Sequence, residues 1–200
     1  MTNSDSEKKE DAEKQNKEGV VSLMGEVVRF SIIALLFIVP IRVFIAQPYI
    51  VSGASMYPTF ESGEYLIVDQ LSYRFRDPAR GEVIIFRFPQ DTSKYFIKRV
   101  IGLPGETVSL AEGALSIVSK DGAEIALDEP YLGHESGTTF LADVPENKYF
   151  MMGDNRDASL DSRIFGAVSR EYVVGRALVR LLPPTRMDVF PGLYEYGAEH

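Results

Sequence analysis

Hydrophobic positions follow two different patterns along this chain. From Val27 to Ala46 they form one nearly continuous apolar segment, VVRFSIIALLFIVPIRVFIA, interrupted by Arg29 and Arg42. A helix of about 20 apolar residues spans the hydrocarbon of a bilayer, and long arginine side chains reach the headgroups on either side. The pattern therefore predicts one transmembrane anchor helix over residues 27–46.

Two other interpretations of this segment fit it less well. A cleaved signal peptide needs small residues at positions −3 and −1 before the cut, and Phe44-Ile45-Ala46 is a poor site of that kind. A helix that lies along the membrane surface needs a strongly charged second face, which this segment lacks. A spanning helix is the preferred interpretation.

The distribution of basic residues predicts the orientation of the anchor. The basic residues at its N-terminal side are Lys8, Lys9, Lys14, Lys17 and Arg29. Beyond Arg42 the next basic residue is Arg74. Because Lys and Arg concentrate on the cytoplasmic side, we expect residues 1–26 to form a polar cytoplasmic tail. Residues 47–200 then form an extracytoplasmic domain of a single-pass protein of the plasma membrane.

Short apolar runs replace the long segment after residue 47. Runs rich in β-branched and aromatic residues are Tyr65–Val68, Val83–Phe88, Tyr95–Ile101, Thr107–Leu110, Leu115–Val118 and Tyr149–Met152. Turn formers such as Asp77-Pro78 and Pro104-Gly105 separate them, and no long amphipathic pattern follows the anchor. We predict a mainly β domain, an antiparallel sandwich or partial barrel whose loops carry the functional site.

Composition and charge exclude several classes of function. The net charge is −8, with 29 acidic and 21 basic residues, which argues against nucleic acid as a partner. The absence of cysteine excludes disulfides, thiolate catalysis and zinc sites built from cysteine. The only histidines are His134 and His200, and no cluster of residues implies a metal or an organic cofactor. A hydrolase built from this chain therefore needs a base other than histidine.

Two loop segments contain candidate chemistry. The segment SGASMYPT at residues 52–59 combines small residues with a proline turn, which can hold a serine at a fixed angle. The segment MMGDNRDASLDSR at residues 151–163 is dense in turn formers and paired charges. Taken singly, the first also fits an ordinary serine-rich turn and the second a solvated loop held by hydrogen bonds.

A third segment places a lysine on an apolar strand face. In YFIKRVIGLPGE at residues 95–106, Lys98 shares a face with Phe96 and Val100 because side chains alternate along a strand. Such a lysine either extends its amine to water at an edge or is held away from water. Only a neutral amine accepts a proton, so a lysine base needs its pKa lowered from ~10.4 by roughly three units, which burial can supply.

Four blocks of sequence, read together, resemble a known family. They are Ser-Met-x-Pro-Thr at 55–59, Arg-Gly-Glu-Val at 80–83, Lys-Arg-Val-Ile-Gly-Leu-Pro-Gly-Glu at 98–106 and Gly-Asp-Asn-Arg-Asp-Ala-Ser-Leu-Asp-Ser-Arg at 153–163. Their order behind an N-terminal anchor is similar to that of bacterial type I signal peptidases. Residues 107–148 contain no such block.

The resemblance implies a catalytic Ser/Lys dyad. Ser55 would attack the scissile carbonyl and Lys98 would take its proton, with Ser159 orienting the amine of Lys98. Asp161 and Arg163 would pair to hold their loop.

The resemblance also implies how a substrate binds. The backbone N–H of Ser55 is the expected oxyanion donor. Where some relatives carry a second donor two residues earlier, this chain has Gly53, and the nearest hydroxyl is that of Ser52. The partners would be exported preproteins with small residues at −1 and −3, bound as extended strands beside the lipid bilayer. The candidate pocket walls are Ile50, Val51, Met56, Phe96 and Ile97.

Three alternatives compete with this interpretation. A self-cleaving repressor of the LexA kind shares the Ser/Lys chemistry, but it is cytoplasmic and carries a DNA-binding domain, which an acidic and then apolar N-terminus does not fit. A catalytically silent β module tethered to the membrane would bind exported chains without cutting them. A serine triad completed by His134 is disfavoured because its neighbours are typical of a surface loop.

Overall fold

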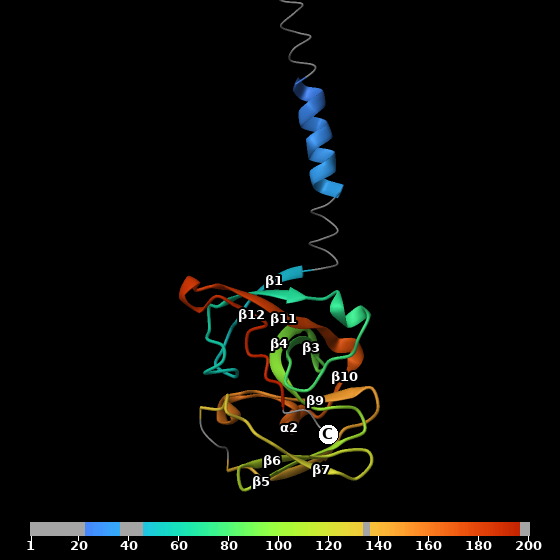
Figure 1. Ribbon diagram of the computed structural model, residues 1–200, viewed down its shortest axis with the longest axis vertical. Helices are drawn as coiled ribbons and strands as arrows, with labels where there is room; N and C mark the ends of the chain where they lie inside the picture. Colours follow the sequence, from blue (N-terminus) through green and yellow to red (C-terminus); the bar gives the residue numbers. More distant parts are fainter. Residues whose placement is uncertain (1–22, 37–45, 134–136, 197–200) are drawn as a thin grey trace, which may run out of the picture. The chain divides into compact units, whose positions relative to one another are not determined.

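The computed structural model describes residues 23–36, 46–133 and 137–196. The chain divides into Met1–Phe44 and Ile45–His200, and each unit is described by itself. In the first unit, residues 23–36 are helical (Figure 1). Within the described residues, no helix combines the length and apolar character needed to cross a bilayer. Residues 1–22 of the expected tail and 37–45 of the expected anchor lie outside the described residues.

The second unit is built on a larger antiparallel sheet of eight strands (Figure 1). Its spatial order is β1 (Ala46–Ile50), β2 (Tyr65–Asp69), β11 (Val173–Leu182), β3 (Val83–Phe88), β4 (Asp91–Gly102), β9 (Lys148–Met152) and β10 (Val168–Ser169), with β12 (Asp188–Val189) paired to β11. Short helices connect them: η2 (Ser72–Arg74), η3 (Arg156–Ala158), α2 (Ser162–Phe165), η4 (Arg170–Tyr172) and η5 (Pro184–Arg186).

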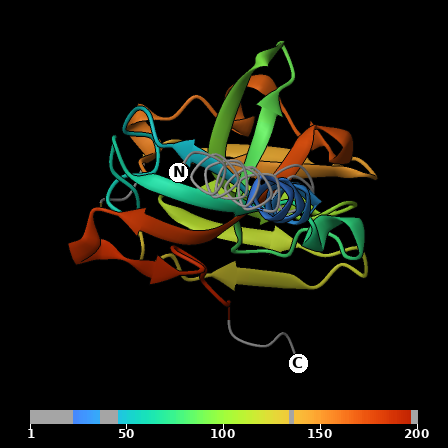
Figure 2. The ribbon, with the colours of Figure 1, turned by 90° about the horizontal axis from the view of Figure 1, so that it is seen from above.

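A smaller sheet of four antiparallel strands is inserted between β4 and β9. Its order is β7 (Glu124–Leu127), β6 (Ala114–Val118), β5 (Thr107–Ala111) and β8 (Phe140–Asp143). A buried apolar cluster joins Val108 and Ile117 of this sheet to Ile101 and Phe150 of the larger one. Figure 2 shows the strands of both sheets seen from above. The smaller sheet therefore adds a packed layer to the larger one.

The predicted fold class is confirmed in its mainly antiparallel β character. All six predicted runs fall within strands, namely β2, β3, β4, β5, β6 and β9. β4 begins at Asp91, four residues before the predicted run. The anchor was expected to reach Ala46, but Ala46–Ile50 forms β1. Proline is tolerated there because β1 is an edge strand of the sheet.

Strand β11, in the middle of the larger sheet, was not predicted. Its sequence VVGRALVRLL places arginines where a central strand normally has apolar residues. Arg176 pairs with Asp69, and Arg180 pairs with Glu64. Because carboxylates on neighbouring elements satisfy these guanidinium groups, the arginines can occupy a central strand.

Candidate active site

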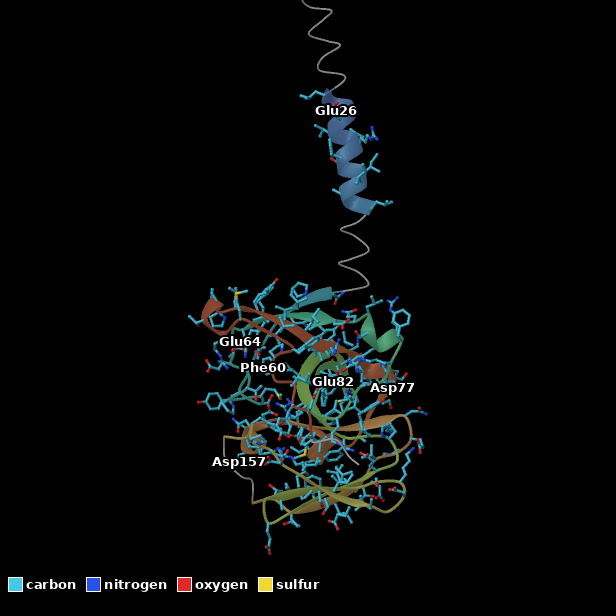
Figure 3. All side chains as sticks on the ribbon, in the orientation of Figure 1. Glu26, Phe60, Glu64, Asp77, Glu82 and Asp157 are labelled. Atoms are coloured by element: carbon cyan, nitrogen blue, oxygen red, sulfur yellow. The ribbon has the colours of Figure 1, made fainter. Side chains whose placement is uncertain are left out.

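Ser55 lies in the connection between β1 and β2, which we call the Ser55 loop (residues 51–64). Backbone hydrogen bonds from Val51 N to Glu64 O and from Gly63 N to Val51 O, both 2.9 Å, close the base of this loop. Figure 3 labels Phe60 and Glu64, which belong to its returning arm. Phe60 is fully buried, so it anchors the loop in the core below β2 and β3. The loop predicted at residues 52–59 is confirmed.

Strand β4 brings Lys98 to the Ser55 hydroxyl. Lys98 pairs with Ile84 of β3 and is only 3% exposed. Its Nζ lies 2.6 Å from Ser55 Oγ and donates a further hydrogen bond to the carbonyl oxygen of Ile97 at 2.9 Å. The ring centroid of Phe96 lies 5.4 Å from the same nitrogen. Two residues 43 positions apart in sequence therefore meet at hydrogen-bond distance.

Burial changes the proton affinity of this amine. Desolvation lowers the pKa of Lys98 to about 8, against the opposing attraction of the Asp161 and Asp154 carboxylates. A pKa of about 8 leaves roughly a tenth of the amine neutral at pH 7, whereas an ordinary lysine is almost wholly protonated. The amine beside Ser55 is thus able to accept a proton under ordinary conditions.

Ser159 is buried close to this pair. Its Oγ has no hydrogen-bond partner among the described residues, Lys98 included. It lies near enough to Asp161 to help lower the pKa of that carboxyl without making a hydrogen bond of normal geometry. A Cβ built on Gly153 would come within 2.3 Å of Ser159 Oγ and 2.4 Å of the Ser55 carbonyl oxygen. Only glycine therefore fits at position 153, where the two serine segments converge.

Asp161 and Arg163 form the pair that the sequence suggested. Arg163 Nε donates to Asp161 Oδ1 at 2.8 Å, and the backbone N–H of Gly153 donates to Oδ2 at 3.0 Å. Burial by itself raises the pKa of Asp161, but these hydrogen bonds outweigh it and the pKa is lowered overall. Asp161 therefore remains charged and holds the loop of residues 153–163 in place.

A second buried ion pair was not foreseen from the sequence. Arg99 is fully buried, and its Nε and Nη2 donate to the two carboxylate oxygens of Asp154 at 2.8 and 2.6 Å. Thr59 Oγ1 also donates to Asp154, and Asn155 N donates to the carbonyl oxygen of Ser55 at 3.0 Å. Three of the four sequence blocks are therefore joined directly. The signal for this ion pair in the sequence was Arg99 itself, a second charged residue next to Lys98 in an otherwise apolar strand.

The remaining block, at residues 80–83, also supports the fold through ion pairs. Arg80 Nη2 lies 2.7 Å from Glu106 Oε1, and Arg80 Nη1 donates to the carbonyl oxygen of Ile101. Glu82, labelled in Figure 3, accepts hydrogen bonds from Tyr73 and Arg76. These contacts fix the ends of β3 and β4, and so the position of Lys98 on β4.

A cavity of about 470 Å³ opens beside Ser55 and Lys98. Its lining includes Tyr49, Ile50, Val51, Ser52, Gly53, Ala54, Leu66, Ile85, Lys94, Tyr95, Phe96, Ile97, Ala158 and Leu160. Four of the five predicted wall residues and Ser52 therefore border it. Met56 does not, because its side chain points into the core and is only 1% exposed. The sequence did not predict Leu66, Ile85 and Leu160 as wall residues, because they come from elements whose approach to Ser55 no local pattern reveals.

Among the described residues, the candidate site has no cluster of metal ligands. In residues 23–36, 46–133 and 137–196, no group of three or more His, Asp or Glu is arranged to hold a metal ion. His134 and His200 lie outside the described residues. The hydroxyl of Ser55 and the amine of Lys98, 2.6 Å apart, are the candidate reacting groups among the described residues.

Comparison with known proteins assigns the family. The family model described as signal peptidase, peptidase S26, matches residues 24–182. The chain belongs to this family. The S26 chain is 37% identical over 163 residues to a probable signal peptidase I-2 of Synechocystis sp., covering 78% of this chain and 72% of the relative. It is also 37% identical over 169 residues to signal peptidase I T of Bacillus subtilis, covering 78% and 84%.

A solved structure belongs to the same group. The crystal structure of a signal peptidase I from Enterococcus faecalis V583 is 34% identical to the S26 chain, with a TM-score of 0.44, and the match covers 50% of this chain and 97% of that one. The family match and the sequence relatives identify the protein as a serine peptidase, a hydrolase. The interpretations as a self-cleaving repressor and as a silent binding module are therefore wrong.

Proposed function

We propose that this S26 peptidase removes N-terminal signal peptides from exported preproteins, cutting after an Ala-x-Ala-like site with a Ser/Lys dyad. The observation that carries the proposal is the distance of 2.6 Å between Lys98 Nζ and Ser55 Oγ at the wall of an apolar cavity. The names of the relatives, signal peptidase I, indicate the class of substrate.

The proposed reaction begins with proton transfer between these two side chains. The neutral amine of Lys98 takes the hydroxyl proton while Ser55 Oγ bonds to the scissile carbonyl carbon. The ammonium then gives its proton to the leaving amine, which departs as the new N-terminus of the mature protein. Water, activated by the same amine, hydrolyses the acyl ester and frees Ser55.

Electrostatic stabilisation comes from groups around the scissile carbonyl. The backbone N–H of Ser55 donates to the developing oxyanion, and Ser52 is the nearest candidate for a second donor. The role expected for Ser159, orienting the amine of Lys98, has no hydrogen bond behind it among the described residues. The Asp161–Arg163 pair holds the loop that carries Ser159, with Asp161 bonded to Gly153 N at 3.0 Å.

The shape of the cavity suits short apolar side chains. An extended substrate would lie between the segment at residues 50–55 and the segment at residues 94–98, both of which line the cavity. Ile50, Val51 and Ile97 offer apolar walls against which small apolar side chains at −1 and −3 would pack, whereas a charged side chain would lose its hydration there.

The proposed location is the plasma membrane, with the N-terminus in the cytoplasm and residues 47–200 outside. An anchor over residues 27–46 would confine the enzyme to the surface that holds its substrates, because signal peptides also reside in the bilayer. Confinement of both partners raises their effective concentration.

The test is cleavage of a defined preprotein by the detergent-solubilised full chain. We expect a preprotein with an Ala-x-Ala site to yield one mature product, whose new N-terminus is read by mass spectrometry. Ser55→Ala should leave the preprotein intact, while Ser119→Ala, in an exposed turn beside the smaller sheet, should cut at the wild-type rate. An uncut preprotein with wild-type enzyme would refute the proposed function.

A further inference from the structure

The chain continues beyond the family's matched residues as a short segment that we call the C-terminal strap (Phe190–Tyr196). The family match ends at residue 182, whereas the strap follows β12 at Asp188–Val189. It appears in red at the end of the described chain in Figure 1. Tyr196 packs against the core between the two sheets, so the strap is part of the folded body.

The strap contacts the residue that follows Lys98 on β4. The carbonyl oxygens of Gly192 and Gly81 both accept hydrogen bonds from Arg99 Nη1. Tyr194 N donates to Gly81 O at 3.4 Å, and a Cβ built on Gly81 would lie 1.8 Å from Tyr194 O. The strap backbone therefore closes directly over the buried guanidinium of Arg99, with no room for a side chain at position 81.

The same strap residue contacts the Ser55 loop. Gly192 has φ +74°, and a Cβ built on it would lie 2.6 Å from Thr59 Cγ2 and 3.0 Å from Phe60 Cε2. Thr59 is the residue that donates to Asp154, the carboxylate partner of Arg99. Gly192 is thus in contact with the two segments that carry the nucleophile and the base.

Three tyrosines hold the strap in this position. The Tyr131 ring lies 3.7 Å from the Arg99 guanidinium carbon, and its hydroxyl is hydrogen-bonded to that of Tyr196. Tyr194 packs on both rings, with centroids 5.5 Å from Tyr131 and 4.9 Å from Tyr196. Burial raises the pKa of Tyr196 to about 12, so this hydroxyl stays protonated near neutral pH.

We propose that the C-terminal strap is a positioning element of the dyad, which clamps Arg99 and Thr59 together and thereby holds Lys98 against Ser55. Gly192 acts through Arg99 and Thr59, which adjoin the reacting groups. The inference rests on the proposed function only in assigning the dyad its role.

Loosening the strap has a defined electrostatic consequence. The charged groups that influence Lys98 are Asp154 and Asp161, and both favour its protonated form. Those that border the strap are Arg99, Asp128, Glu129, Arg156 and Arg176. Loss of the Thr59 contact would let the Ser55 loop move away from Lys98 and admit water to the amine, which moves its pKa upward toward the ordinary value. A rise of about half a unit would cut the neutral fraction of Lys98 at pH 7 about threefold.

The experiment compares Gly192→Ala with Gly122→Ala in the full chain. Both glycines have positive φ, +74° and +86°, but nothing lies within 4 Å of a Cβ at position 122. The two variants therefore share the backbone strain and differ in the contact with Thr59. In Gly192→Ala, we expect the pH midpoint at which kcat rises on the acid side (the acid limb) to move upward by about half a pH unit, with KM unchanged. Gly122→Ala should have the same pH profile as wild type.

A second variant covers the case in which Gly192→Ala does not fold. Tyr196→Phe removes the hydroxyl bonded to Tyr131 without adding atoms, and we expect a smaller upward shift of the same limb. The proposal is overturned if the folded variants of Gly192 and Tyr196 keep the wild-type pH profile. A loss of rate by the same factor at every pH, with no shift, also overturns it.

A measurement without substrate separates this inference from the proposed function. NMR titration of chains labelled with 15N at the lysine side chains gives the pKa of Lys98, assigned by its loss in Lys98→Met. An upward shift in Gly192→Ala supports the strap even if the wild-type chain cuts no preprotein, an outcome that would refute only the proposed function. An unchanged pKa, with wild-type cleavage intact, overturns the strap alone.

Discussion

Charged residues are arranged differently around the proposed Ser55–Lys98 dyad and beside the smaller sheet. Around Lys98 the pairs Arg99–Asp154 and Asp161–Arg163 are buried and join separate loops. Beside the smaller sheet the pair Lys120–Glu146 is exposed, and the interior is apolar. Buried pairs require a fixed geometry, because a charge without its partner is costly inside a protein. The comparison indicates that side-chain positions are fixed most tightly around Ser55 and Lys98, while the smaller sheet contributes apolar packing.

The largest expected effect comes from a change of lysine chemistry at the site. Lys98→Arg keeps the charge, but a guanidinium stays protonated at any working pH and cannot accept the proton of Ser55. We expect kcat on a preprotein to fall by about 10³-fold or more. Lys120→Arg, beside the smaller sheet, should leave kcat unchanged. Wild-type cleavage by Lys98→Arg would exclude Lys98 as the base.

The ion pairs of the two regions should differ in their contribution to stability. Asp154→Asn leaves the buried Arg99 without its carboxylate, so we expect the free energy of unfolding to fall by about 3 kcal/mol or more. Glu146→Gln removes the exposed partner of Lys120 and should cost about 0–1 kcal/mol. Urea unfolding followed by circular dichroism measures both. Equal losses in the free energy of unfolding of Asp154→Asn and Glu146→Gln would show that the buried and exposed ion pairs do not differ in their contribution to stability.

Burial of the lysine should also appear as a dependence of stability on pH. Because the pKa of Lys98 is lowered to about 8, between that pH and its ordinary pKa the unfolded chain binds more protons than the folded one. The contribution of Lys98 to stability is therefore least favourable below about pH 8 and improves as the pH rises toward 10. Lys98→Met should be more stable than wild type at pH 7, by up to about 3 kcal/mol, with a smaller gap at pH 10.

The matched control for this titration is Lys120→Met. Its side chain is largely exposed, so its difference from wild type should stay small across the same pH range. A Lys98→Met difference that is constant from pH 7 to 10 would show that the amine is not held away from water.

The smallest expected effect concerns the cavity. Ile97→Ala shortens a side chain in the cavity wall beside Lys98 and so widens the cavity. We therefore expect kcat/KM for preproteins with Val at −1 or −3 to rise about tenfold relative to kcat/KM for preproteins with Ala at those positions. Leu141→Ala, on a residue of the smaller sheet that is 72% exposed, should leave this ratio unchanged. An unchanged ratio in Ile97→Ala, measured with paired preproteins, would place the specificity pocket elsewhere.

Much of this fold could be read from the sequence, for a physical reason. Runs such as Val83–Phe88 are continuous, β-branched and aromatic, and so predict strands by themselves. β11 was not predicted because Arg176 and Arg180 interrupt its pattern, and the buried carboxylates that pair with them, Asp69, Glu82 and Glu64, lie more than 90 residues away. β1 was not predicted because it directly follows the apolar segment that was expected to be helical.

The residues of the candidate site could be proposed from the sequence, but their geometry could be predicted only in part. Alternation along the strand placed Lys98 among apolar neighbours, and its burial confirms that interpretation. The approach of Ser55 to Lys98 depends on a loop whose path follows from Thr59, Asp154 and Arg99, and no local pattern encodes that network. Met56 was misplaced because the direction of a side chain in a loop has no period to follow.

The central claim is that a neutral lysine amine takes the proton of Ser55, and the rate of preprotein cleavage as a function of pH tests it most directly. With wild-type enzyme we expect kcat/KM to rise with pH through a single acid limb near pH 8, the pKa to which burial lowers Lys98. A limb at or below pH 6, or a rate independent of pH from 6 to 9, would contradict the account.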